Sequence, residues 1–223
     1  MKILAFDTAT EYCSAALWLE GNLLERTERA GQTHSQLLLP QCRSLLEEAR
    51  IDLQQLDCIA FGMGPGSFTG LRIGCAAAQG LAFAADLPVI GINSLQAMAA
   101  ESGGDKVLVC LDARMGEIYH ALYARVDGSI LEIRAPGVCK PEEMPGLDGD
   151  GWTGCGNGFA TYAAVLMSQF GGALNLVTEN CYPYARQIAI LAAGQFAKEG
   201  GCAAESALPL YIRNKVALKI SER

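Results

Sequence analysis

The sequence Ile59-Ala-Phe-Gly-Met-Gly-Pro-Gly-Ser-Phe-Thr-Gly-Leu-Arg-Ile-Gly74 decides the fold class, because it predicts a buried strand, a glycine-rich turn and the start of a helix. The turn collects backbone N–H groups at a helix N-terminus, where they favour an anion. In the helix, Gly70, Gly74, Ala78 and Ala82 recur at i, i+4 spacing, and such a bare face lets a second helix approach closely. The segment therefore allows two interpretations: phosphate binding and protein–protein contact.

The composition is that of an α/β protein with an unusually apolar surface. Of the 223 residues, 51% are hydrophobic and 18% are charged, and the net charge is -7. This length is sufficient for one large domain or two small lobes. The mean hydropathy of +0.20 indicates an apolar surface that a partner covers. No lysine- or arginine-rich run occurs, which argues against the chain binding nucleic acid by itself, although a basic partner could do so.

Nine cysteines are scattered along the chain without any CxxC spacing. Their odd number and mostly apolar surroundings predict reduced core thiols in a cytoplasmic protein rather than disulfides or a metal site. Strand-like sequence begins at Lys2, so we expect no signal peptide. The apolar region 74–92 contains Gln79, Asp86 and Pro88, so we expect no membrane span.

Two stretches of the chain repeat the same order of features. Each begins with an apolar strand that ends in an aspartate, Asp7 or Asp112, and continues with a turn, a second strand, a hairpin tip and a short third strand. Each copy later has a Gly-x-Gly turn that opens a helix. The sequence thus predicts a duplicated α/β fold with an N-terminal lobe at 1–104 and a C-terminal lobe at 105–223.

Apolar periodicity and capping residues predict the helices. One helix begins at Thr33 or Ser35 and runs to about Arg50, and Pro40 inside it predicts a late start or a kink. Ser94 is expected to cap another helix. The remaining expectations are helices at 67–85, 160–169 and 183–198, a loop at 136–151, and a short strand or docking segment at 210–212.

Duplicated lobes that each open with a strand, an aspartate and a hairpin resemble the actin, sugar-kinase and Hsp70-like ATPase superfamily (ASKHA), whose lobes are ribonuclease-H-like. Within it, the chain resembles the TsaB (YeaZ) family. The resemblance covers nearly the whole chain and is carried by FDTAT at 6–10, FGMGPGSFTGLRIG at 61–74, GLAFA at 80–84, LDARMGEIY at 111–119 and PLYIRNKVA at 209–217.

The resemblance implies a role in making threonylcarbamoyladenosine, the modified adenosine next to the anticodon of certain tRNAs. Members of the TsaB family are non-catalytic partners of the paralogue TsaD, which transfers the threonylcarbamoyl group to the tRNA, and the small ATPase TsaE joins the pair. The resemblance further implies a homodimer through the surface that otherwise binds TsaD, with tRNA contacted only indirectly. We expect no cofactor on the isolated chain, while ATP or ADP at the interface of the complex stays open.

A first candidate set contains residues that are vestigial or face a phosphate. It comprises Asp7, Thr8, Thr10, Gly64, Gly66, Ser67, Asp112, Gly156 and Gly158. In the ATPases of the superfamily a glycine follows the first aspartate by two residues, whereas here the position is Ala9, whose Cβ should crowd a phosphate. Ser67 breaks the G-x-G-x-x-G pattern, and no P-loop lysine follows. We therefore favour tight strand-to-helix packing, with a brace role for Asp7.

Metal and acid–base chemistry find little support. Ser94 and Met98 stand where TsaD has two metal-binding histidines, and neither is a suitable ligand, so we expect no metal site. The only histidines are His34, expected to be a cap or contact residue, and His120, expected to face solvent or a sheet neighbour.

The second candidate set contains partner-binding residues. The helix at 67–85 is apolar on nearly all sides, because Leu71, Ile73 and Leu81 add a second apolar side to the small-residue stripe. Such a helix must be covered on both sides, and we favour a partner on one of them. The predicted partner-binding residues are His34, Leu38, Cys42, Leu45, Gly70, Leu71, Gly74, Ala78 and Leu81. This hypothesis predicts that Gly74→Leu breaks the assembly but leaves the fold largely intact.

Two other functions stay in consideration. An active small-molecule kinase or ATPase of the same superfamily would use Asp7, Asp112 and the glycine turns for phosphates, and it predicts ATP binding by the isolated chain. A peptidase is disfavoured, because the sequence contains no nucleophile elbow and no HExxH.

Overall fold

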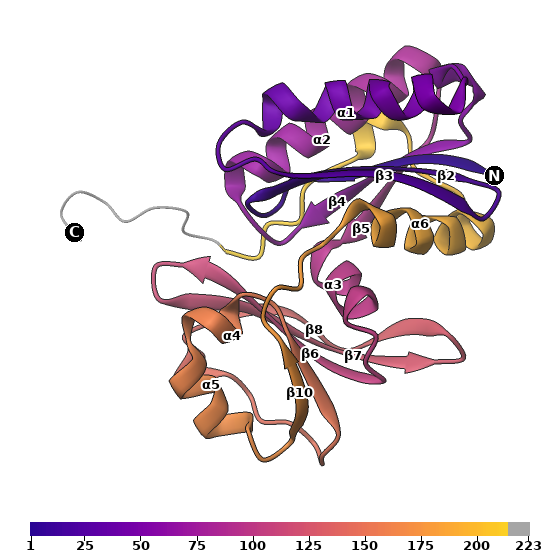
Figure 1. Ribbon diagram of the computed structural model, residues 1–223. Helices are drawn as coiled ribbons and strands as arrows, with labels where there is room; N and C mark the ends of the chain where they lie inside the picture. Colours follow the sequence, from indigo (N-terminus) through magenta and orange to yellow (C-terminus); the bar gives the residue numbers. More distant parts are fainter. Residues whose placement is uncertain (214–223) are drawn as a thin grey trace.

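Two five-stranded sheets form the two lobes of the computed structural model, which describes residues 1–213 (Figure 1). The first sheet contains β1 (Lys2–Asp7), β2 (Tyr12–Leu19), β3 (Asn22–Arg29), β4 (Cys58–Gly64) and β5 (Val89–Asn93). The second contains β6 (Lys106–Arg114), β7 (Glu117–Val126), β8 (Ser129–Cys139), β9 (Trp152–Cys155) and β10 (Leu174–Thr178). The helices are α1 (His34–Ala49), α2 (Phe68–Ala85), α3 (Ser94–Ser102), α4 (Gly158–Thr161), α5 (Ala163–Phe170) and α6 (Ala185–Glu199), with short 3₁₀ turns η1 (Leu53–Gln55), η2 (Pro141–Glu143) and η3 (Ala204–Ser206).

The two sheets have the same topology. Their strand orders are β3-β2-β1-β4-β5 and β8-β7-β6-β9-β10. In each, the first three strands in sequence pair antiparallel through hairpins, and the fourth and fifth add in parallel on the other side of the first. Parallel neighbours need a crossover connection, which α1 and α2 supply in the first lobe. The predicted α/β fold with duplicated lobes is confirmed.

The first sheet lies between two layers of helices (Figure 1). Successive side chains of a strand point to opposite faces, so Leu4 and Phe6 of β1 pack in the cluster beneath α1 and α2, whereas Ile3 and Ala5 pack against α6. Both faces are buried, which explains why β1 reads as a continuous apolar run. Between the lobes lies α3, which packs against the second sheet.

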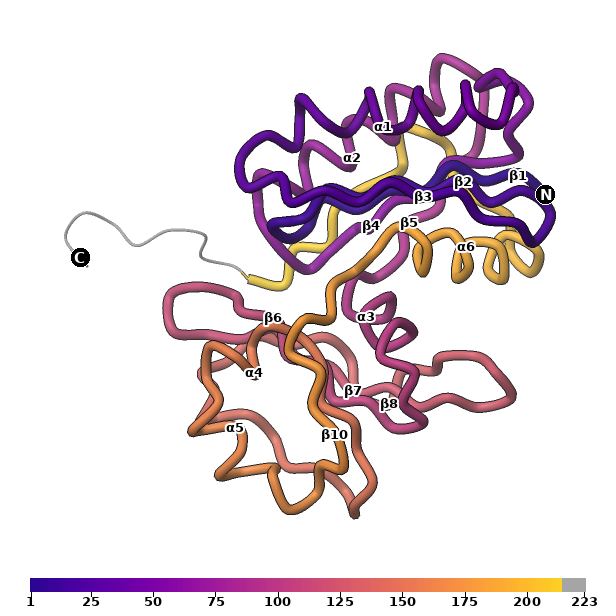
Figure 2. The backbone as a smooth tube through the Cα atoms, in the orientation of Figure 1, coloured from indigo at the N-terminus to yellow at the C-terminus, as the bar shows by residue number. Residues whose placement is uncertain are grey.

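The helix α6 returns to the first lobe, although it follows the whole second sheet in the chain. Its residues Ala185, Ile188 and Ala192 pack against Ile3 of β1. Figure 2 shows this late part of the chain lying directly below the N-terminal strands. The division at 104 and 105 therefore describes the two copies in the sequence, whereas the packed first lobe is built from both ends of the chain.

The starts of α2 and α3 are capped by side chains, whereas Thr33 before α1 makes no side-chain cap bond. Ser67 caps α2 by accepting the N–H of Gly70 at 3.3 Å. The cap of α3 is Asn93 rather than Ser94, because the Asn93 side chain accepts the N–H of Leu95 at 2.9 Å and Ser94 is already helical. The helix α1 begins at His34 with Pro40 inside it, so the late start that Pro40 suggested is wrong.

The second lobe differs most from the prediction. The strand β8 continues to Cys139, into the first residues of the predicted loop at 136–151, and Gly137 provides the room for His120 directly opposite in β7. The expected helix at 160–169 is split into α4 and α5 at Tyr162. The strand β10 was not predicted, since its five residues show little alternation. The expected strand at 210–212 is absent among the described residues, and the segment docks instead, as described below.

Among the helices of residues 1–213, none has the length and apolar character needed to cross a membrane.

Candidate functional site

A cleft of about 780 Å³ separates the two lobes. Four members of the predicted phosphate-facing set line it, namely Thr10, Gly66, Ser67 and Asp112. The other five, Asp7, Thr8, Gly64, Gly156 and Gly158, are buried and lie outside its lining. The structure therefore divides the set into a cleft-facing part and a part that holds the chain together.

Asp7 is buried at the end of β1 and braces the space between the first hairpin and α3. One carboxylate oxygen accepts the N–H of Ala9 at 2.7 Å, and the other accepts the hydroxyl of Ser94 at 3.0 Å. The hydroxyl of Ser94 in turn accepts the N–H of Gly64 at 3.2 Å. Desolvation by burial raises the pKa of Asp7 to about 7, against the lowering effect of these hydrogen bonds. Its oxygens are thus used inside the protein.

The glycine turn lies directly against the first hairpin. The N–H of Ser67 donates to the carbonyl of Ala9 at 2.7 Å, and a Cβ on Gly66 would lie 2.7 Å from the Cβ of Ala9. A Cβ on Gly70 would overlap the carbonyl oxygen of Thr8. The amides of Ser67 and Gly70, which could otherwise face an anion, are already bonded within the chain. The glycines of this turn serve close packing.

The second copy of the motif is closed in a similar way. A Cβ on Gly158 would lie 2.8 Å from the carbonyl oxygen of Cys110. The side-chain oxygen of Asn157 accepts the N–H of Asp112 at 2.9 Å. The carboxylate of Asp112 pairs with Arg114 at 3.1 Å and accepts the hydroxyl of Tyr162 at 3.2 Å. Asp112 is therefore the more accessible of the two motif aspartates, yet its oxygens are also occupied.

The two histidines and Met98 also have contacts inside the protein. The ring Nε2 of His34 donates to the carbonyl of Thr10 at 2.9 Å, which makes it a buried contact residue. His120 is buried against Gly137, its sheet neighbour, and burial lowers its pKa. Met98 lies fully buried in the core of the second lobe. Within residues 1–213, no group of three or more His, Cys, Asp and Glu side chains is arranged to hold a metal ion.

Most of the predicted partner-binding set is buried in the single chain. Eight of its members are buried inside the chain, namely His34, Leu38, Cys42, Leu45, Gly70, Leu71, Gly74 and Ala78, and only Leu81 is half-buried. Within the isolated chain these side chains are mostly covered by its own residues, and His34, Gly70 and Leu71 lie along the interlobe cleft. The Gly74→Leu prediction also changes, because a Cβ on Gly74 would lie 2.7 Å from the Thr8 hydroxyl oxygen, so the fold itself would be disturbed.

The opposite side of α2 is exposed and almost uncharged. We call Arg72, Ala76, Gly80, Phe83 and Ala84 the outer face of α2. The Phe83 side chain is 84% exposed, and a Cβ on Gly80 would meet nothing within 4 Å. These residues share a helix face at i, i+4 and i, i+3 spacing, so the helical pattern could have identified them. Beside α2 in the same layer lies α1, where Leu39 is 50% exposed (Figure 1).

Comparison with known proteins gives consistent matches. The family model of TsaD, described as tRNA N6-adenosine threonylcarbamoyltransferase, matches residues 26–218. The tRNA threonylcarbamoyladenosine biosynthesis protein TsaB of Escherichia coli (strain K12) is 39% identical, with 98% of this chain and 97% of that protein covered. TsaB of Haemophilus influenzae is 36% identical, with 98% and 96% covered.

Solved structures agree with these sequence matches. YeaZ from Pseudomonas aeruginosa superposes with a TM-score of 0.84 at 36% identity, over 94% of this chain and 99% of that chain. A second Pseudomonas aeruginosa structure, described as an uncharacterized protein with similarity to peptidase YEAZ, gives a TM-score of 0.88 at 37% identity, over 95% and 99%. Full-length likeness in both sequence and fold shows that the chain belongs to the TsaB (YeaZ) family.

Proposed function

We propose that the chain acts in tRNA threonylcarbamoyladenosine biosynthesis as a non-catalytic subunit that binds a TsaD-type paralogue. The names of the full-length relatives support the pathway, and the match to the TsaD family model supports kinship with the transferase. A TsaE-type ATPase joins the pair in this proposal, and tRNA is reached only through the complex. In the absence of the paralogue, the chain forms a homodimer in the cytoplasm.

The outer face of α2 is the observation that carries this proposal. A phenylalanine that is 84% exposed, next to alanines and a glycine on one helix face, leaves apolar area in water that a partner would remove. A partner helix can approach closely at Ala76 and Gly80, because neither carries a large side chain. Leu39 of α1 extends the apolar surface. Two helices from each of two chains would then form the contact.

The closed state of both motif turns supports the non-catalytic role. Asp7 points into the protein, and the N–H groups of Ser67 and Gly70 at the start of α2 are bonded within the chain. An active kinase or ATPase would need these groups free for phosphates and a metal ion. We therefore expect no nucleotide on the isolated chain, and if ATP or ADP takes part, we place it at the interface of the complex.

The test compares two aspartate substitutions of exposed apolar helix residues. Phe83→Asp places a charge on the outer face of α2, whereas Ile190→Asp does so on α6, which covers the other side of the first sheet. We expect Phe83→Asp to weaken binding to a TsaD-type paralogue by about tenfold or more, as for a central apolar contact, and Ile190→Asp to leave it unchanged. Binding is measured by calorimetric titration and by size-exclusion chromatography with light scattering.

Equal affinity of Phe83→Asp and wild type would contradict the assignment of the interface. ATP titrated into the isolated chain separates the rival function, because an active kinase or ATPase would bind and turn over ATP without a partner. In that case Asp112, at the cleft, would become the first catalytic candidate.

A further inference from the structure

The C-terminal strap, residues 207–213, crosses from the first lobe to the second at the interlobe cleft. Figure 1 shows it as the last yellow segment, which leaves the first lobe and reaches the gap between the lobes. Its residues Leu210, Tyr211, Ile212 and Arg213 line the cleft. The strap belongs to neither copy of the duplicated motif.

The strap is held on the first lobe by backbone and side-chain contacts. The carbonyl of Ala207 accepts the side-chain N–H of Gln79 at 2.9 Å. The N–H of Leu210 donates to the carbonyl of Met63 at 2.7 Å, at the end of β4. The Tyr211 hydroxyl accepts from Arg72 at 3.1 Å, and its ring packs on Phe68 with 5.6 Å between the ring centroids. These successive contacts fix the strap to α2 and β4.

On the second lobe the strap is held by side chains alone. Ile212 packs against the core cluster that contains Leu111 and Tyr119. The guanidinium of Arg213 forms an ion pair with Glu117 and donates to the carbonyl of Arg114 at 3.3 Å. The Arg213 side chain is 13% exposed, and its Nε is buried without a hydrogen-bond partner among residues 1–213. An unsatisfied buried N–H costs free energy, so this end is held less strongly.

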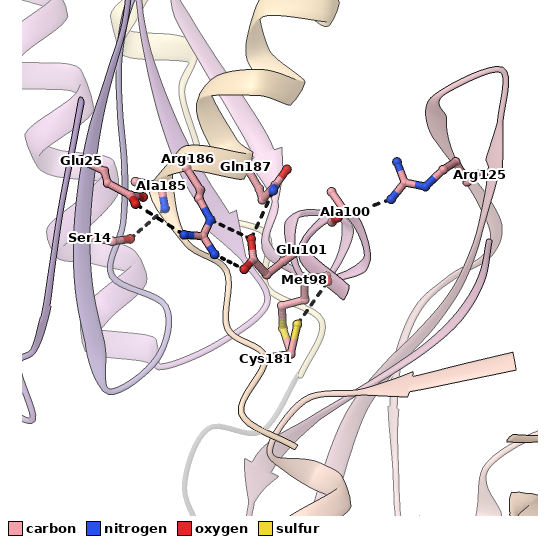
Figure 3. A network of polar contacts seen from close by, with 10 residues as sticks. All are labelled: Ser14, Glu25, Met98, Ala100, Glu101, Arg125, Cys181, Ala185, Arg186 and Gln187. Atoms are coloured by element: carbon pink, nitrogen blue, oxygen red, sulfur yellow. Dashed lines mark hydrogen bonds and ion pairs between the residues drawn. The ribbon is translucent and has the colours of Figure 1, made fainter. Parts of the chain in front are cut away.

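The lobes are joined at another place by a denser network, shown in Figure 3. Glu101 of α3 accepts from Arg186 at 2.9 Å and from Gln187 at 3.1 Å, both on α6. Arg186 also reaches Glu25 of β3 at 3.4 Å. Since α3 packs on the second sheet and α6 on the first, this network links the lobes where the chain itself crosses.

We propose that the strap is a latch that holds the cleft closed. The lobes pivot at the contact between α3 and α6, and release of Ile212 and Arg213 from the turn between β6 and β7 lets the cleft widen. The contacts at Leu210 and Tyr211 keep the strap on the first lobe during this movement. The release occurs at the second lobe, because a single ion pair, one further hydrogen bond and one apolar side chain are weaker than several bonds that include the backbone.

The test removes each partner of the ion pair in the full-length chain. Arg213→Gln, Glu117→Gln and the double variant are compared by hydrogen–deuterium exchange, followed at the cleft-facing segments 66–70 and 111–119, and by small-angle scattering. We expect exchange in both segments to rise by about two- to fivefold, which corresponds to loss of one partly exposed pair. The radius of gyration increases, and the double variant behaves like either single one. Raising the salt concentration has the same effect on wild type and little further effect on the variants.

Arg43→Gln is the matched control, because Arg43 forms an exposed ion pair with Glu47 on α1 and is far from the strap in sequence and contacts. Circular dichroism and thermal unfolding report whether each variant is folded. Tyr211→Phe is a milder variant on the first lobe, because it removes the hydroxyl that accepts from Arg72 and keeps the ring on Phe68. Faster exchange confined to 207–213, an unchanged radius of gyration, or effects of the single variants that multiply in the double variant would each overturn the latch.

Discussion

Three glycines of α2 should respond in opposite ways to the addition of a single methyl group. In an exposed helix, Gly→Ala stabilises by about 0.5–1 kcal/mol, because alanine loses less backbone entropy on folding. Gly80→Ala should show this gain in full, since its Cβ meets nothing within 4 Å. Gly74→Ala should not, because its Cβ would lie 2.7 Å from the hydroxyl oxygen of Thr8.

The cost at Gly74 follows from the contacts of Thr8. The Thr8 hydroxyl is buried and donates to the carbonyl of Gly70 at 2.8 Å, so it cannot move aside without losing that bond. Overpacking of this kind costs about 1–3 kcal/mol, and a strained buried hydrogen bond adds about 1 kcal/mol. After the propensity gain is subtracted, Gly74→Ala should destabilise by about 1–3 kcal/mol. Gly70→Ala should be worse, because its Cβ would overlap a backbone carbonyl, which has no rotamer to change.

Urea and thermal unfolding, followed by circular dichroism, measure the difference. Gly80→Ala and Gly74→Ala should differ by about 2–4 kcal/mol, which corresponds to about 4–16 °C in Tm for a chain of this size. Because Gly80 lies on the proposed partner face, the comparison is made at two protein concentrations, so that any contribution from a dimer is seen. Shifts of the same sign and size in both variants would refute the inside and outside assignment of α2.

Three further predictions rest on other buried groups. Burial raises the pKa of Asp7 from 3.8 to about 7, so its contribution to stability is complete below about pH 4 and is lost as the pH rises through 7. Asp7→Asn should therefore gain stability relative to wild type between pH 5 and pH 8, as measured by urea unfolding. Parallel plots of unfolding free energy against pH for the two proteins would contradict this. Arg186→Gln leaves Glu101 without its charged partner and should destabilise by about 1–3 kcal/mol, with partial recovery in the Glu101→Gln background, whereas Arg43→Gln should stay within about 0.5 kcal/mol. Iodoacetamide should label Cys202 first in the native chain, because it alone among the cysteines is exposed. Early labelling of a buried thiol, detected by mass spectrometry, would argue against the packing that buries that thiol.

The elements that the sequence predicted best are those specified by local chemistry. The expected helix at 67–85 agrees closely with α2, whose start is set within one turn of helix by the Ser67 cap. The duplicated strand, aspartate and hairpin order was visible because each hairpin is formed by neighbours in the chain. Where the sequence erred locally, as with Gly137 inside β8, the deciding contact was His120 on another strand.

The candidate site was predicted less well, because its roles depend on distant contacts. A helix that is apolar on nearly all sides is predicted to be covered on more than one side, but its sequence pattern does not indicate which side packs on its own sheet. The stripe at Gly70 and Gly74 turned out to lie against Thr8 of the first hairpin, which left Gly80 and Phe83 outside.

By itself, the sequence determined the α/β class, the two copies, the main helices and the family, because these follow from short-range periodicity, caps and motifs. Only the tertiary structure decided that Asp7 is buried against Ser94, 87 positions away, that α6 returns to the first sheet, and that the strap joins the lobes. Each of these depends on which apolar faces meet in the folded chain. Because hydrophobic burial is non-directional, a sequence pattern does not identify the partner of a given apolar face.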